Sequence, residues 1–158
     1  MVGVLNVNNA ELLPKVVALT RMGKHVRIPL KGFSMNPYLV GGRDNALLAQ
    51  PTGKEKAGDV VLVQLQPGRY ALHRILWIDD KSVQTIGDGN LTPDPVISVS
   101  QIDAIAIGFF RKNREKVEPL DSWKFRTYST IWTRLRPVRR WLLAFYRRLI
   151  MKRKYKNI

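Results

Sequence analysis

Residues 31–37 read Lys-Gly-Phe-Ser-Met-Asn-Pro, and this stretch is the strongest indication of the fold. A glycine and a proline flank Ser34, as in a sharp turn that presents a small hydroxyl group. Most serines in such turns have no chemical role, so residues further along the chain decide the interpretation. His73 lies in an apolar run, and Asp88 and Asp94 follow in a loop rich in turn residues. A serine, a histidine and an aspartate are the parts of a nucleophile, its base and an orienting carboxylate.

The sequence around this turn predicts a mainly β domain. Apolar or alternating runs are separated by clusters of Gly, Pro, Asn and Asp, which is typical of an antiparallel sheet that curls on itself. We expect residues 79–81 to form a tight hairpin turn within the sheet. An amphipathic helix is expected at residues 10–22, and packing on the domain or on a second copy is favoured over membrane docking. The expected strands are residues 26–30, 45–49, 59–64, 70–78, 82–86 and 102–110.

The chemistry of the candidate site follows from these residue types. A serine hydroxyl is a poor nucleophile at neutral pH and needs a neighbour that accepts its proton. Histidine suits this task because its unperturbed pKa is about 6.5, close to the working pH. The alternative for His73 is a core histidine bonded to a carbonyl group, but the serine turn and the Gly-Asp loop favour the base. The residues alone leave both Asp88 and Asp94 open as the carboxylate that orients the histidine.

Four pieces with this chemistry occur in order along the chain. They are Ser34-Met35-x-Pro37, Gly58-Asp59-Val60-Val61, His73-Arg74, and Gly87-Asp88-x-Asn90 with Asp94. Together they resemble the type I signal peptidases, which share a protease fold with the self-cleaving SOS repressors. The resemblance covers roughly residues 32–110. It is to the branch found in archaea, the endoplasmic reticulum and some bacteria, in which histidine replaces the usual lysine base.

The resemblance implies a curled antiparallel β-sheet protease fold and a serine endopeptidase that removes a signal or leader peptide from a polypeptide or precursor-peptide substrate. It also implies that Asp94 is the triad aspartate and that Asp88 is a second acid that supports the loop or the site. The amide of Ser34 is the expected oxyanion donor. The residues expected to shape the oxyanion site, the turn and the groove are Gly32, Met35 and Pro37.

Positive charge is concentrated towards the C-terminal end. Residues 121–158 carry 12 Lys/Arg and a single acid, a net charge of +11 out of the chain's +15. A helix at residues 137–152 would be amphipathic, and a basic helix rich in Trp and Phe is typical of one that lies on an anionic membrane. Packing on its own domain or on a partner is the second interpretation, and nucleic-acid binding is the least favoured. The expected membrane contacts are Trp141, Phe145, Arg139, Arg140, Arg147 and Arg148, with Trp123, Tyr128, Trp132 and Tyr146 as further interfacial aromatics.

Composition and hydropathy set the remaining expectations. The chain has no cysteine and only two histidines, so we expect no disulfide, no metal and no cofactor. No stretch approaches the roughly 20 apolar residues that span a bilayer, and residues 1–33 lack a signal-peptide pattern. We therefore expect a protein on the cytoplasmic side, peripheral to the membrane. The expected segments are a helical segment (1–24), a peptidase domain (25–118) and a basic amphipathic extension (119–158). The alternative is a non-catalytic or self-processing relative that binds a membrane surface or nucleic acid.

Overall fold

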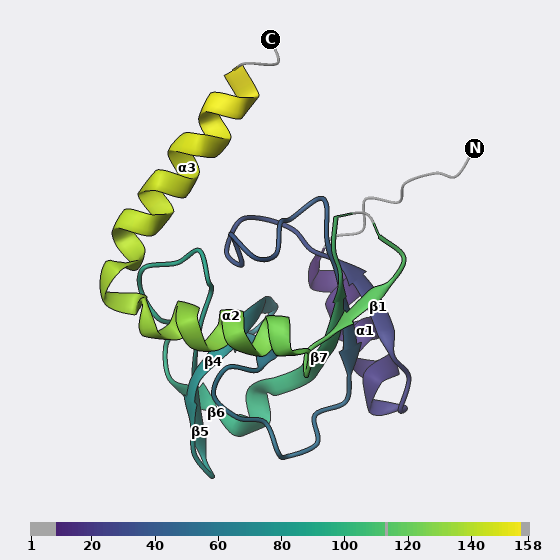
Figure 1. The fold of residues 1–158 in the computed structure, drawn as a ribbon. Coiled ribbons are helices and arrows are strands. Elements are labelled where there is room, and N and C mark those ends of the chain that lie inside the picture. Colours follow the sequence, from purple (N-terminus) through teal and green to yellow (C-terminus); the bar gives the residue numbers. More distant parts are fainter. Residues whose placement is uncertain (1–8, 113, 156–158) are drawn as a thin grey trace, which may run out of the picture.

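An antiparallel sheet of 8 strands forms the core of the protein, which a computed structural model describes for residues 9–112 and 114–155. The strand order is β1-β2-β7-β3-β4-β5-β6, and β8 pairs with β7. Figure 1 shows how the sheet curls on itself. The strands are β1 (Val26–Pro29), β2 (Asn45–Ala49), β3 (Val60–Gln66), β4 (Arg69–Ile78), β5 (Ser82–Ile86), β6 (Ile97–Ser98), β7 (Ile102–Phe110) and β8 (Val117–Pro119).

The predicted mainly β, curled antiparallel fold is confirmed. All six predicted strands form, and their ends differ from the prediction by at most about two residues, the usual uncertainty of strand ends. The predicted hairpin between β4 and β5 also forms, because the Asp79 carboxylate accepts hydrogen bonds from the backbone N–H groups of Lys81 and Ser82. The short strands β6 and β8 were not predicted.

Both faces of the sheet are covered near its centre. Consecutive side chains of β3 point to opposite faces, so that Val60 and Leu62 join one apolar cluster while Val61 and Val63 join another. This two-sided burial explains why the β3 sequence is almost entirely apolar. Helix α1 (Asn9–Arg21) covers the first face and buries three aliphatic side chains there. They are Leu13, Val16 and Val17.

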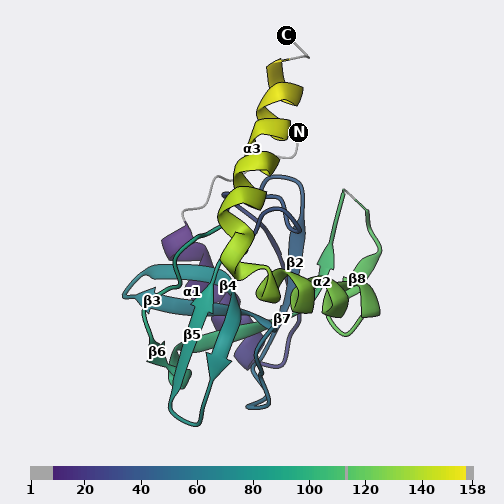
Figure 2. The ribbon, with the colours of Figure 1, turned by 60° about the vertical axis from the view of Figure 1, so that its left-hand side comes forward.

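Two helices follow the sheet, and the first of them was not predicted. Helix α2 (Trp123–Arg134) begins at Ser122, whose side chain accepts a hydrogen bond from the Phe125 N–H. A 3-10 turn, Arg136–Val138, connects α2 to helix α3 (Arg139–Tyr155). Figures 1 and 2 show α2 lying against the sheet while α3 extends away from it. Within the described residues, no helix has the length and apolar character needed to cross a bilayer.

The placement of α2 corrects part of the membrane interpretation. Phe125 belongs to the same apolar cluster as the buried face of α1, and Trp132 is also buried. Tyr128 stacks on Tyr38 rather than facing outward. The first half of the predicted C-terminal extension therefore packs on the sheet, because its aromatic side chains recur on one helical face. Arg139 is only 2% exposed, so it does not contact a membrane in this conformation.

Candidate active site

The loop that carries Ser34 leaves β1 and returns to β2, and backbone hydrogen bonds tie its two ends together. Leu30 donates to the Asp44 carbonyl, and Gly42 donates to the Leu30 carbonyl. The buried Asp44 carboxylate also accepts hydrogen bonds from Val40 and Lys112. Burial alone would raise the pKa of Asp44, but hydrogen bonds from Arg43 and these backbone groups hold it below its usual value. The ionised carboxylate thus fixes the end of the loop.

The loop at residues 87–90 presses directly against the serine turn. The Gly89 N–H donates to the Ser34 carbonyl at 2.7 Å. A Cβ atom on Gly87 would lie 2.4 Å from the same carbonyl oxygen, and one on Gly89 would lie 2.4 Å from the Phe33 carbonyl oxygen. Both glycines are therefore required by close backbone approach. This contact explains why a Gly-Asp-Gly sequence follows β5.

Asp94, rather than Asp88, faces the candidate base. His73, on β4, is 6% exposed, and its Nδ1 lies 2.6 Å from Asp94 Oδ2. Burial acts to raise the pKa of Asp94, but the hydrogen bond with His73 and another from Thr85 hold it below its usual value. An ionised carboxylate only accepts hydrogen bonds, so the imidazole proton is assigned to Nδ1. This leaves Nε2 as the nitrogen that can accept a proton.

Ser34, His73 and Asp94 line one cavity of about 360 Å³. Among the hydrogen bonds of the described residues, none joins Ser34 to His73, and none engages the Ser34 N–H. Within the described residues the Ser34 N–H is thus left without a partner, which suits an oxyanion donor. Of the other predicted site residues, Gly32 and Met35 also line the cavity, whereas Pro37 and Asp88 are not part of its lining.

The cavity lies between two strand edges that have no partner in the described part of the chain. β1 pairs with β2 alone. The first half of β4, residues 69–73, pairs with β3 only, because its pairing with β5 begins at Arg74. Residues of both edges line the cavity, and its apolar lining includes Leu12 and Leu13 of α1. Free strand edges bind an extended peptide by adding it as a strand.

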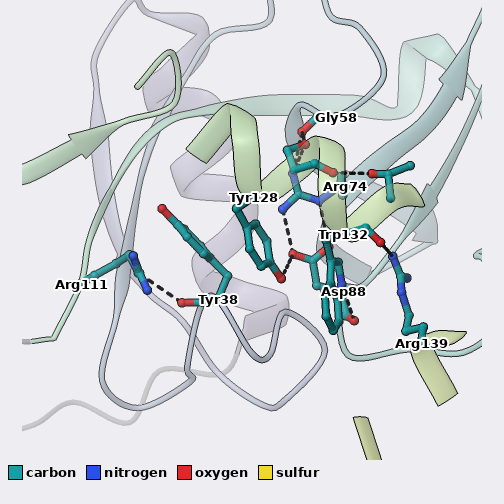
Figure 3. Close-up of polar contacts among 10 residues, drawn as sticks. Tyr38, Gly58, Arg74, Asp88, Arg111, Tyr128, Trp132 and Arg139 are labelled. Atoms are coloured by element: carbon teal, nitrogen blue, oxygen red, sulfur yellow. Dashed lines mark hydrogen bonds and ion pairs between the residues drawn. The ribbon is translucent and has the colours of Figure 1, made fainter. Parts of the chain in front are cut away.

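Asp88, the other candidate for the orienting carboxylate, pairs with Arg74. Arg74 donates from Nε and Nη2 to the two Asp88 carboxylate oxygens, each at 2.8 Å, and both side chains are fully buried (Figure 3). Its Nη1 donates to the Gly58 carbonyl and to Ser129 Oγ. Burial disfavours a charged guanidinium, but Asp88 keeps the pKa of Arg74 above its usual value. The Arg74–Asp88 ion pair therefore holds the 87–90 loop in place against the serine turn.

Helix α2 supports both loops of the site. The Tyr128 hydroxyl donates to the Asp88 carboxylate at 3.3 Å, and Trp132 Nε1 donates to the Asp88 carbonyl at 3.1 Å (Figure 3). The Tyr128 ring stacks on Tyr38 of the serine loop with 4.4 Å between centroids. Sequence reasoning missed these supports, although Phe125, Tyr128 and Trp132 recur at the spacing of one helical face.

Arg139, at the start of α3, contacts Trp132 of α2, although it was predicted to contact a membrane. Its Nη2 donates to the Trp132 carbonyl, and its guanidinium lies over the Trp132 ring. Nε and Nη1 have no hydrogen-bond partner, and burial lowers the pKa of Arg139. Arg139 therefore joins α3 to α2 and does not form part of an outer surface.

The other predicted membrane contacts lie on the exterior of α3. Trp141, Phe145, Arg140, Arg147 and Arg148 are exposed.

Among the described residues, no group of three or more His, Cys, Asp and Glu side chains is arranged to hold a metal ion. Comparison with known proteins finds no matching family model, no matching curated protein and no matching solved structure.

Proposed function

We propose that this chain is a serine endopeptidase of the signal peptidase-like type, in the branch that uses histidine as its base. The observation that carries the proposal is the cavity lined by Ser34 and His73, with Asp94 on the other imidazole nitrogen. A nucleophile, a base and an orienting carboxylate are the three parts that acyl transfer from a peptide requires. The order of these residues in the chain is also the one in the family that the sequence resembles.

The reaction begins when Ser34 Oγ attacks the scissile carbonyl carbon and its proton passes to His73 Nε2. The Ser34 N–H stabilises the oxyanion that forms. The peptide C–N bond then breaks, and the leaving amine takes the proton from Nε2. Water attacks the acyl-enzyme and gives a proton to Nε2, which returns it to Ser34 Oγ as the acid product leaves. Asp94 stays ionised throughout and stabilises the imidazolium.

In the free protein the Ser34 hydroxyl is not hydrogen-bonded to His73, so this hydrogen bond has to form when substrate binds. Loose geometry of this kind is common before substrate binds, since catalytic hydrogen bonds tighten in the substrate complex. A substrate strand between β1 and the first half of β4 would place its backbone beside Ser34. The apolar lining around Leu12, Leu13 and Met35 favours apolar side chains near the cleaved bond. A signal or leader peptide has this character.

Labelling with a fluorophosphonate probe tests the proposal. Wild-type protein should become labelled at one site, and Ser34→Ala should not be labelled. His73→Ala should be labelled at least about 10³-fold more slowly, because the serine then has no base. Ser100→Ala is the matched control, since Ser100 is an exposed serine in a short 3-10 turn. Labelling that survives Ser34→Ala would end the proposal, and a folded wild-type protein that takes up no label would favour a non-catalytic binding module.

A further inference from the structure

Helix α3 has an exposed apolar stripe on the side that faces away from the body. Arg139 and Leu143 are buried, so this side of α3 faces the protein. At about 100° per residue, Trp141 lies about 200° around the helix from Arg139, and Phe145 follows one turn later. Trp141 is 73% exposed and Phe145 is 64% exposed. The α3 stripe consists of Trp141, Leu142, Phe145 and Leu149 of α3, together with Val138 at the end of the preceding 3-10 turn.

Positive charge borders the α3 stripe. Arg148 is exposed about 20° round the helix from Trp141, while Arg140 and Arg147 are exposed about 100–120° from it, and α3 contains no acidic residue. Figures 1 and 2 show that α3 projects outward from the body, and the stripe residues are exposed. Contiguous exposed aromatic and aliphatic side chains on a helix mark an interaction surface.

We propose that the α3 stripe docks on an anionic lipid surface, with α3 lying along the interface between headgroups and acyl chains. An apolar stripe rich in Trp, Phe and Leu enters this interface, and bordering arginines bind anionic headgroups. A second copy of the chain fits less well, because antiparallel or parallel pairing would bring the same positive borders together. Nucleic acid would bind the arginines but leave the apolar stripe uncovered.

The candidate active site is joined to α3 on the side of the helix away from the stripe. Arg147 of α3 donates to the Gly89 carbonyl, and Gly89 donates to the Ser34 carbonyl. Helix α3 is therefore joined to the loop that supports the serine turn. Phe33, next to Ser34, is 78% exposed. Docking through the stripe would therefore keep the cavity near a peptide that is held at the same membrane, a consequence that rests on the proposed function.

The test uses full-length protein and flotation with vesicles of phosphatidylcholine alone or mixed with phosphatidylglycerol. Binding should occur on the mixed vesicles at low salt and weaken as salt rises. Arg140→Glu and Arg148→Glu should each weaken it at least about fivefold. Trp141→Ala and Phe145→Ala should each weaken it about tenfold, because each removes an aromatic side chain from the interface. These side chains are exposed, so the variants should keep the wild-type circular dichroism spectrum.

Two control variants show whether docking depends on the α3 stripe and whether it is independent of catalysis. Trp123→Ala removes an equally exposed tryptophan on α2, away from the stripe, and should bind vesicles as the wild type does. Ser34→Ala should also bind unchanged, so that docking and peptidase activity fail independently. Equal binding to both vesicle types, or binding unaffected by Trp141→Ala and Phe145→Ala, would overturn the proposal. So would a lipid-free dimer in sedimentation velocity that Trp141→Ala abolishes, or tight binding to duplex DNA in place of vesicles.

Discussion

Asp94 and Asp88 lie in one loop but have different partners. Asp94 contacts His73 and Thr85 at the cavity, while Asp88 is enclosed by Arg74 and the side chains of α2. The Asp94 contacts suit a carboxylate that orients a base, and those of Asp88 suit one that holds a loop. The sequence alone left this choice open, because a carboxylate's role depends on partners that lie far away in the chain. Arg74 follows His73 directly, yet its side chain points to the opposite side of the strand.

The first prediction concerns the pH dependence of stability at Asp94. Its pKa is lower in the folded protein than the usual value, so the unfolded chain binds the proton more tightly. Its contribution to stability is therefore present above about pH 4 and is lost as the pH falls below that value. Asp94→Asn should flatten the decline in the free energy of unfolding below about pH 4, as measured by urea denaturation at a series of pH values. Asp80→Asn, at an exposed turn, should keep the wild-type profile, and an equally steep decline in Asp94→Asn would contradict the prediction.

The second prediction concerns the buried fork between Arg74 and Asp88. Arg74→Met should lower the free energy of unfolding by about 3–5 kcal/mol, because it leaves a buried carboxylate without its partner. Arg74→Met combined with Asp88→Asn should recover part of this loss, since the second change removes the unpaired charge. Urea denaturation of the two single variants and the double variant gives the coupling energy. Strictly additive effects would show that the pair does not act as a unit.

Among the elements, the strands were predictable and α2 was not. The strands alternate in polarity or are apolar over a short length, and glycine, proline or aspartate marks their ends, so local sequence is sufficient. Helix α2 lies in the basic part of the chain, where Lys124, Arg126 and Arg134 suggested an exterior tail. Its aromatic face becomes informative only when Asp88 and Tyr38 are known to lie opposite. The serine, the histidine and the loop acids were likewise local signals. The contacts of α2 with Asp88 and Tyr38 join segments that are far apart in the sequence, so local sequence does not predict them.

The third prediction tests whether α2 belongs to the core. Phe125 is buried among Tyr38 and Phe109, so Phe125→Ala should cost about 3–5 kcal/mol of stability. Trp132→Phe should cost about 1–3 kcal/mol, because it leaves the Asp88 carbonyl without its indole donor. Trp123→Ala, at the exposed start of the same helix, should change stability by less than about 0.5 kcal/mol. Equal effects of Phe125→Ala and Trp123→Ala in urea denaturation would show that α2 is not packed as described.

At the scale of the whole molecule, the boundary between folded body and exterior helix falls inside α3. Arg139 and Leu143 are buried and Arg147 still donates to the Gly89 carbonyl, so one face of α3 packs on the body as far as Arg147 while its opposite face is exposed from Trp141 onward. The charge concentrated after residue 120 is therefore shared between a core helix and an exterior one. Net charge alone gives no indication of this division, because it reports on partners and not on fold.

The fourth prediction compares two shortened chains. A chain ending at Asp121 lacks Phe125 and Trp132 and should show no cooperative thermal unfolding. A chain ending at Arg148 keeps Arg139, Leu143 and Arg147 and should unfold within about 0.5 kcal/mol of the full-length protein. Circular dichroism during heating distinguishes the two. A stable, cooperative chain ending at Asp121 would show that α2 is dispensable for folding.

The support that α2 gives to the site has a consequence for the timing of synthesis. Ser34, His73 and Asp94 all leave the ribosome before Tyr128 and Trp132, which brace the loops beside them. A nascent chain can therefore form the hairpins of the sheet while its serine turn and its 87–90 loop are still unbraced. We expect Ser34 to become correctly placed only late in translation, when α2 can reach the sheet. Under the proposed function, the peptidase would then stay inactive towards neighbouring nascent polypeptides until its own synthesis is nearly finished.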